Sequence, residues 1–179
     1  MENLKNSNSI SVADWMTETV LAVEIYDSIS VARQLMAKHR VNQLPVIDHE
    51  RLLGIVTDRD IRDAYPTSMM IGRTKEIDKF AESYTVEEVM THDVFTVEPE
   101  TPLATAVALL RHHRIGSLPV VKGKQLVGII TRSDILDFVL SGAGIKMAPA
   151  SKKARKKMPA AKKGKRSKAA GDRRTSKIL

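Results

Sequence analysis

The chain has 179 residues, 42% of them hydrophobic, a net charge of +8 and no cysteine. That length can bury the core of one ordinary domain or two small ones, and the lack of cysteine excludes disulfides and thiolate chemistry. The chain contains no run of eighteen apolar residues, so no membrane span is expected. Its polar start, "MENLKNSNSI", lacks the apolar stretch of a secretory signal. We therefore expect a cytoplasmic protein.

Charge divides the chain into two unlike parts. Residues 1–145 hold 15 Lys and Arg and 20 Asp and Glu, a net charge of −5, whereas residues 146–179 hold 14 Lys and Arg and one acid, a net charge of +13. This asymmetry predicts an acidic partner for the tail alone. The tail is almost free of large apolar residues, so we expect it to be disordered.

An internal repeat fills most of the acidic part. Residues 12–64 align with residues 86–138 at a constant spacing of 74, without a gap, and 20 of the 53 pairs are identical. Two copies are too few for a solenoid, which needs at least three repeats. The repeat therefore predicts a duplicated unit that packs against itself with pseudo-twofold symmetry.

Each copy opens with a short helix and a short strand. Ser11 with Asp14, and Thr85 with Glu88, are capping-box pairs that begin the helices "VADWM" and "VEEVM". The β-rich runs "VLAV" and "VFTV" follow, and they predict the first strand of each copy.

A longer helix comes next in each copy. Asp27 and Thr101 are the expected N-caps, and Pro102 fits the first turn. Apolar residues at helical spacing predict one buried face in each helix. These residues are Ile29, Ala32, Leu35 and Met36 in the first copy, and Leu103, Ala106, Leu109 and Leu110 in the second.

Each copy closes with a β-hairpin and a last helix. The strands "LPVID" and "LLGIV" enclose the turn "HE", and "LPVVK" and "LVGII" enclose the turn "GK". The last helices begin near Asp58 and Arg132. The fold class is therefore α/β (α+β), with helix, strand, helix, strand, strand and helix in each copy. We divide the chain into a flexible N-terminus, a first unit, a linker, a second unit and a basic disordered tail, at residues 1–10, 11–64, 65–84, 85–140 and 146–179.

The repeated phrase "GIVTDRDI" and "GIITRSDI" lies where the hairpin passes into the last helix. Its Thr and Asp have two interpretations. In the structural one, Thr57 with Asp60 and Thr131 with Asp134 are further capping boxes. In the functional one, the helix N-terminus attracts phosphate, the Thr hydroxyl donates to a phosphate oxygen, and the carboxylate accepts from ribose hydroxyls.

Four neighbours of these pairs bear on the choice. Arg59 and Arg132 could add charge-assisted contacts to phosphate. Gly54 and Gly128 either let the backbone approach a base or suit the packing.

We find no catalytic constellation and no metal-ligand spacing, so we expect neither an enzyme nor a catalytic cofactor.

At these residues the sequence resembles the cystathionine-β-synthase (CBS) domain family. Both copies carry the patterns "MT…V…V", "A..L…H.R" and "LPV…..L.GI.T..DI", over about residues 12–138. The resemblance implies two tandem CBS domains of β-α-β-β-α fold, packed through their sheets as a Bateman module. It also implies an adenosyl regulatory ligand (AMP, ADP, ATP or S-adenosylmethionine) in clefts between the copies.

The resemblance implies roles for single residues. Asp60 and Asp134 would hold the ribose, and Thr57 and Thr131 the phosphate. The adenine would lie against the first strand of each copy and the segment before "LPV", which are Val20, Ala22, Val94 and Thr96, and Asn42, Gln43, Gly116 and Ser117. Some nucleotide-sensing members have His or Arg just before "LPV", so this chain is expected to hold a polyphosphate more weakly.

The first copy's "TDRDIRDAYPTS" also resembles CBS proteins of the acetoin-utilisation type, which carry a further ligand-binding domain where this chain has its basic tail. Two functions follow as hypotheses. One is a regulatory, homodimeric CBS-pair protein that binds an adenine nucleotide, with residues 146–179 binding nucleic acid without regard to base sequence. The alternative is a nucleic-acid-associated structural protein that uses the CBS pair mainly to dimerise.

Overall fold

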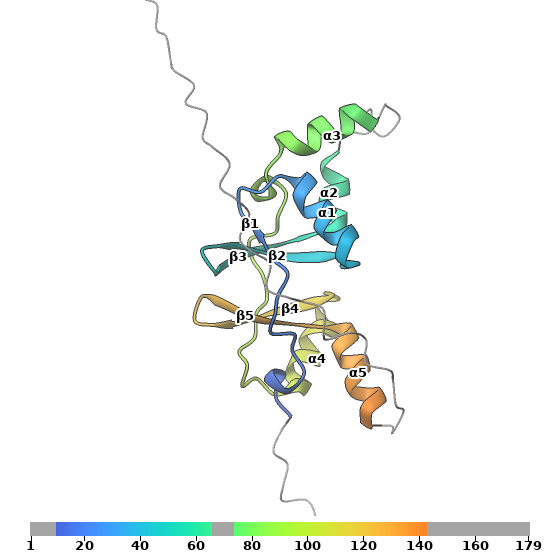
Figure 1. Cartoon of the computed structure of the whole chain (residues 1–179). Coiled ribbons are helices and arrows are strands. Elements are labelled where there is room, and N and C mark those ends of the chain that lie inside the picture. The colour runs from blue at the N-terminus through green and yellow to red at the C-terminus, as the bar shows by residue number, and fades with distance from the viewer. Residues whose placement is uncertain (1–9, 66–73, 143–179) are drawn as a thin grey trace, which may run out of the picture.

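The structure is a computed structural model that describes residues 10–65 and 74–142. The predicted basic tail lies outside the described residues, as does most of the predicted flexible N-terminus. Figure 1 shows two similar halves, with the β-hairpins facing each other at the centre and the helices on the outside. No helix within the described ranges is long and apolar enough to cross a membrane.

The elements of the first half follow the predicted order. They are the 3-10 helix η1, strand β1, helix α1, hairpin strands β2 and β3, and helix α2, at Val12–Asp14, Val23–Glu24, Ile29–His39, Gln43–Asp48, Arg51–Thr57 and Asp58–Ala64. The hairpin turn is tight because His49 and Glu50 both take left-handed backbone angles, with φ of 48° and 70°, as a two-residue hairpin turn of this kind requires.

The second half repeats this order after an additional helix. The linker forms α3, and η2, α4, β4, β5 and α5 then follow, at Thr74–Ser83, Val86–Glu88, Leu103–His112, Ser117–Lys122, Gln125–Thr131 and Arg132–Gly142. The second hairpin turns at Gly123, which has a φ of 63° and at which an added Cβ would meet nothing within 4 Å. The two hairpins are therefore equivalent elements with different turn residues.

The five strands lie in the order β1-β2-β3-β5-β4. The strands β2 and β3 pair antiparallel over their length, and so do β4 and β5. The two hairpins join only near their tips, where Arg51 pairs with Gln125 and the Leu52 N–H donates to the Lys124 carbonyl at 3.0 Å. The narrow join leaves the inner faces of the two hairpins turned toward each other (Figure 1).

Side chains alternate across each hairpin and so divide it into two faces. Leu44 and Val46 are fully buried in one apolar cluster with the α1 residue Ile29. Leu118 and Ile130 are fully buried in a second cluster with α4. Each copy therefore has its own core on the helix side of its hairpin, and the opposite side faces the other copy.

The two copies exchange their opening segments. Val12 is fully buried in the second copy's core, and its N–H donates to the Thr101 carbonyl at 2.9 Å. Val86 is fully buried in the first copy's core, and its N–H donates to the Asp27 carbonyl at 2.8 Å. Each opening helix thus completes the core of the other copy, and the pseudo-twofold pair is interlocked.

Three details of the predicted elements are wrong. The N-caps are Ser28 and Pro102 instead of Asp27 and Thr101. The side chains of Asp27 and Thr101 instead accept hydrogen bonds from backbone N–H groups three residues earlier in the chain. The Asp27 carboxylate accepts from the Glu24 N–H at 3.0 Å, and the Thr101 hydroxyl accepts from the Glu98 N–H, also at 3.0 Å.

The first strands are also shorter than predicted. Only Val23 and Glu24 form β1, and the equivalent run in the second copy forms a single bridge, from Val97 to Val120. Both runs lie at an edge of the sheet. Each of these β-rich segments therefore has one neighbouring strand to pair with instead of two. The linker helix α3 was not predicted.

Candidate functional site

The two Thr–Asp pairs have nearly identical geometry. The Thr57 hydroxyl and N–H donate to Asp60 Oδ2 at 2.7 and 2.8 Å, and the Asp60 N–H donates to Thr57 Oγ1 at 3.2 Å. The corresponding distances for Thr131 and Asp134 are 2.7, 2.8 and 3.3 Å. Both pairs are partly buried capping boxes, so the structural interpretation of the motif is confirmed.

The capping role leaves part of each carboxylate available. Both cap bonds that each carboxylate accepts go to Oδ2, and Oδ1 of Asp60 and of Asp134 makes no hydrogen bond to any described residue. Because the cap bonds fix the carboxylate in place, the second oxygen is held in a defined direction. The capping role is therefore compatible with a ligand contact by the carboxylate, whereas the single hydroxyl hydrogen of each Thr is already donated to its Asp.

The segment before "LPV" lies directly beside each pair. The Asp58 N–H donates to the Asn42 carbonyl at 2.9 Å, and Gln43 pairs with Thr57 across the hairpin. In the second copy the Arg132 N–H donates to the Gly116 carbonyl at 3.1 Å. The structure thus brings together residues that the sequence places about 15 positions apart.

These residues lie on the hairpin face that turns toward the other copy. The Gln43 side chain crosses to the second copy, where its Nε2 and Oε1 lie 3.1 and 3.3 Å from the position a Cβ of Gly116 would occupy. The missing side chain of Gly116 therefore makes room for Gln43. The segments before "LPV" meet at the centre of the molecule, which sequence spacing alone does not predict.

Ser117 is a buried polar residue with an unmet hydrogen-bonding need. It is 3% exposed, and its Oγ has no hydrogen-bond partner among the described residues. It pairs with Thr131 across the hairpin, so both side chains lie on the same, inner face. A buried hydroxyl without a partner carries a free-energy penalty, which a bound polar group would remove.

The first-strand residues lie at the edge of this arrangement. Val20 and Ala22 precede β1, which runs parallel to β2 with Val23 opposite Val46. Extending that register places Val20 beside the start of β2. In the second copy Val94 is partly buried and Thr96 is exposed, ahead of the bridge to β4.

The two arginines of the motif are both exposed. The Arg59 side chain is 82% exposed and its Nε lies 3.6 Å from the Asp63 carboxylate, a surface ion pair that contributes little stability. Arg132 is exposed at the start of α5. Neither side chain is held in place by a buried contact.

The two motif glycines serve the packing of the exchanged segments. A Cβ on Gly54 would lie 2.5 Å from the Thr91 carbonyl oxygen, and a Cβ on Gly128 would lie 2.5 Å from the Met16 sulfur. The backbone at Thr91 pairs with Ile55 immediately beyond Gly54, at 2.9 and 3.0 Å. Of the two interpretations of these glycines, the structure supports close packing.

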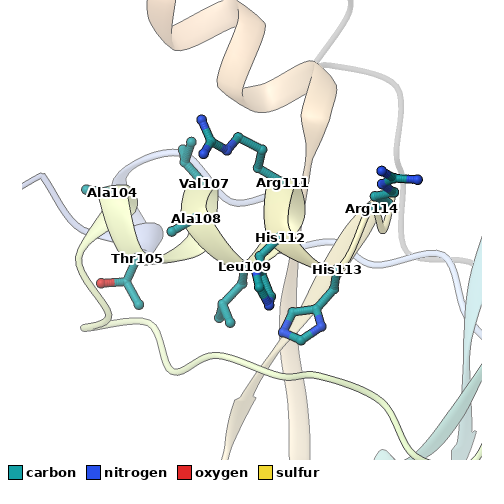
Figure 2. Close-up of a pocket in the computed structure, with 9 residues that line it drawn as sticks. All are labelled: Ala104, Thr105, Val107, Ala108, Leu109, Arg111, His112, His113 and Arg114. Carbon is teal, nitrogen blue, oxygen red and sulfur yellow. The ribbon is translucent and has the colours of Figure 1, made fainter.

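Two surface depressions are not lined by either Thr–Asp pair, although the second includes the predicted site residue Val94. One, of about 770 Å³, runs along α4 and is lined by the nine residues drawn in Figure 2. The other, of about 340 Å³, is lined by His92, Asp93, Val94 and Phe95. The sequence analysis did not single out the exposed residues of this region, because they form no recognisable motif.

Fold and site together define a class of protein. It is a tandem pair of β-α-β-β-α modules, interlocked by exchanged opening helices, with a Thr–Asp turn from each module beside the interface between them. The sequence model of the CBS domain matches residues 12–67 and 86–141. The chain belongs to the CBS domain family, which confirms the resemblance and the predicted fold.

Known relatives cover the same part of the chain. The CBS domain-containing protein YhcV of Bacillus subtilis is 34% identical over 125 residues, which are 70% of this chain and 82% of YhcV. The chain also matches short parts of longer enzymes, such as 14% of an A-adding tRNA nucleotidyltransferase from Geobacter sulfurreducens, at 28% identity. CBS pairs therefore occur both in short proteins and attached to catalytic domains.

Solved structures extend the comparison to ligands. A protein assigned to acetoin utilization (AcuB) from Vibrio cholerae has a TM-score of 0.65 at 31% identity, over 76% of this chain and 94% of that one. The CBS domain pair of MJ0100, in complex with 5-methylthioadenosine and S-adenosyl-L-methionine, has a TM-score of 0.61 at 27% sequence identity. The match covers 74% of this chain and 98% of that one. CBSX2 from Arabidopsis thaliana, in its complex with AMP, has a TM-score of 0.62 at 28% sequence identity. The match covers 74% of this chain and 98% of that one.

Proposed function

We propose that this chain is a regulatory protein that binds an adenine nucleotide or a related adenosyl compound between its two CBS domains. The observation that carries the proposal is the repeated Thr–Asp turn, held rigidly on the inner side of each hairpin with one carboxylate oxygen unused. Such an oxygen accepts hydrogen bonds from ribose hydroxyls, and the neighbouring Thr hydroxyl would donate to a phosphate oxygen by turning away from its cap bond to the Asp. The complexes of MJ0100 and CBSX2 with adenosyl ligands support the ligand class.

The surroundings of the motif support a site for the base. Asn42 and Gln43 in one copy, and Gly116 and Ser117 in the other, offer amide, hydroxyl and backbone groups at the central interface. Val20, Ala22, Val94 and Thr96 complete the proposed lining of the clefts, and Arg59 and Arg132 could reach a phosphate. The unmatched Ser117 hydroxyl favours occupation of the cleft on the second copy's motif.

The experiment is a thermal-shift panel of AMP, ADP, ATP, S-adenosylmethionine and NAD on the full chain. A ligand at 100 times its dissociation constant stabilises the folded state by about 2.7 kcal/mol. Asp60→Asn and Asp134→Asn, alone and together, should remove this shift from the cleft that each one serves. Asn keeps an oxygen that can accept the cap bonds, so the helix start is preserved.

Asp14→Asn is the matched control. Asp14 also closes a capping box, with Ser11, but its side chain is exposed and makes no proposed ligand contact. It should leave every thermal shift unchanged. A full shift in the Asp60→Asn/Asp134→Asn double variant would refute the proposed site. No shift with any ligand in the panel would favour the alternative, a structural protein that uses the CBS pair to dimerise.

Two further parts of the proposal concern partners. The 14 positive charges of residues 146–179 support binding to a polyanion such as nucleic acid, and truncation at Ile145 should abolish binding of a random-sequence DNA duplex in an anisotropy titration. Leu136 and Val139, 63% and 56% exposed on α5, give apolar surface for a closed homodimer. A monomer mass at all concentrations in light scattering would count against the dimer.

A further inference from the structure

An exposed aromatic pair lies at the end of α4, outside the proposed nucleotide clefts. The rings of Phe95 and His113 stack with their centroids 3.8 Å apart and their planes at 27°, and His112 contacts His113 edge-on at 4.8 Å. Phe95 is 47% exposed, and both histidines are exposed. The stack thus presents an unusually large amount of aromatic surface to solvent, in a chain with few aromatic residues.

Two cations lie near this pair. Arg111 and Arg114 line the same depression as His112 and His113, and Figure 2 shows the two arginine side chains on one side of the end of α4 and the two imidazole rings on the other. Neither arginine forms an ion pair with a described residue. The adjoining depression ends on Phe95 itself and contains one acid, Asp93. We call Phe95, Arg111, His112, His113 and Arg114 the α4 corner.

The first copy has no such corner. Leu21 stands at the position of Phe95 and packs against the core. His39, the equivalent of His113, is only partly exposed, and Ala37 replaces Arg111. The cations of the neighbouring helix α2 are also paired, with Arg62 3.4 Å from Asp58. The α4 corner is therefore a feature of the second copy and not of the first.

We propose that the α4 corner binds single-stranded nucleic acid. Proteins that hold single strands combine cations that contact the phosphates with exposed aromatic rings on which bases stack. Here the exposed side of the Phe95–His113 stack would receive a base, and Arg111 and Arg114 would contact phosphates on either side of it. An acidic protein or an anionic membrane would use the cations but would gain nothing from the ring stack.

The proposal goes beyond adenosyl binding and requires neither an occupied cleft nor the basic tail. The corner lies on the helix side of the second copy, because the Phe95 ring stacks on His113 at the end of α4. The tail would add sequence-independent charge, whereas the corner adds contacts to bases. The two contributions can therefore be separated by the choice of probe.

The test uses fluorescence anisotropy with the full chain and two probes of equal length and charge, a thymidine oligonucleotide and its abasic counterpart. Phe95→Ala should weaken binding of the thymidine oligonucleotide roughly tenfold, the typical contribution of one stacked base. It should leave binding of the abasic probe unchanged. Arg111→Gln with Arg114→Gln should weaken both, and should reduce the salt slope by about 1.4, the value for two phosphate contacts on a single strand.

Equivalent changes in the first copy are the controls. Tyr26 is 74% exposed, and Arg40 has a φ of 54° that matches the 55° of Arg114. Tyr26→Ala and Arg40→Gln should leave both affinities unchanged, and all variants should keep the adenosyl thermal shift of the parent chain. That shift also separates failure of this proposal from failure of the proposed nucleotide sites.

Three outcomes would overturn the proposal. The first is an equal effect of Phe95→Ala on both probes, which would mean that the ring does not stack on a base. The second is an effect of Arg40→Gln as large as that of Arg114→Gln, which would assign binding to overall charge. The third is competition by thymidine monophosphate at the same nucleotide concentration, which would assign the corner to a mononucleotide.

Discussion

The two CBS domains of this chain are alike on their inner faces and unlike on their outer ones. The capping boxes at Thr57 and Thr131 agree to within 0.1 Å in each hydrogen bond. On the outside, α3 packs against α1 of the first copy. Among the described residues no equivalent helix covers α4, and Leu136 and Val139 on α5 remain exposed.

The cover of the first copy is an aromatic cluster. Phe80 stacks on Tyr84 at 4.3 Å and contacts Tyr65 at 5.4 Å, and the Tyr65 hydroxyl accepts from Arg33 of α1 at 3.4 Å. The second copy has a smaller aromatic pair, in which Trp15 of the exchanged opening segment contacts Phe138 of α5 edge-on with ring centroids 5.2 Å apart. The comparison teaches that duplication preserved the Thr–Asp turns on the inner faces, while the outer surfaces diverged.

The largest expected difference between the copies concerns their motif glycines. Gly54→Ala would place a Cβ 2.5 Å from the carbonyl oxygen of Thr91, which is fixed by backbone pairing with Ile55. Gly128→Ala would meet the sulfur of Met16, a flexible side chain that can move aside. We expect the free energy of unfolding to fall by about 3 kcal/mol for Gly54→Ala and about 1 kcal/mol for Gly128→Ala.

Urea denaturation of the two variants measures this difference. Gly142→Ala is the control, because a Cβ there has nothing within 4 Å, and it should change the stability by no more than a few tenths of a kcal/mol. Equal losses at Gly54 and Gly128 would show that the Thr91 segment adjusts as easily as a methionine side chain, and the two crossings would then be equivalent.

The second prediction concerns the outer cover. Phe80→Ala should lower the free energy of unfolding by about 2 kcal/mol, less than the roughly 3–5 kcal/mol of a fully buried Phe because Phe80 is only partly buried. Hydrogen exchange should show the loss first in α1. Val139→Ala, on the uncovered α5, should stay within about 0.5 kcal/mol. A loss at Val139 as large as that at Phe80 would instead mean that α5 is covered in solution.

The smallest expected effect tests the symmetry of the exchanged opening helices. The Ser11 N–H, and to a lesser extent its hydroxyl, lower the pKa of Asp14 below its ordinary value of 3.8. Thr85 does the same to Glu88, whose pKa falls below its ordinary value of 4.5. Because folding lowers both pKa values, each box stabilises the folded state above those ordinary values and loses that contribution as the pH falls through the lowered ones.

Carbon-detected NMR titration of the two carboxyl groups measures these pKa values. Ser11→Ala and Thr85→Ala should raise the pKa of Asp14 and of Glu88, each part of the way to its ordinary value, because the larger contribution, from the backbone N–H, remains. The two rises should be similar, since the boxes have the same hydrogen bonds at 2.7–2.9 Å. A rise in the pKa of only one of the two carboxyl groups would show that the two exchanged helices are not equivalent.

The sequence by itself determined the local structure of this protein. Capping boxes, hairpin turns and the last helices depend on residues within a few positions of one another, so their patterns can be read directly. The spacing of 74 also determined that the copies have the same fold. The Thr–Asp turn was identified for the same reason, because all its hydrogen bonds connect residues three apart.

Only the tertiary structure decided which copy each opening helix completes. Val12 and Val86 occupy equivalent positions in equivalent patterns, so the sequence offers each of them two matching cores, and both pack into the core of the other copy. The tertiary structure alone also decided that Gln43 lies beside Gly116 and that the buried Ser117 hydroxyl has no partner among the described residues. It likewise decided that α3 packs against α1, with no equivalent helix described on α4. These features depend on contacts between distant segments, and the free energy of such contacts is set by shape and burial in the folded molecule, not by spacing along the chain.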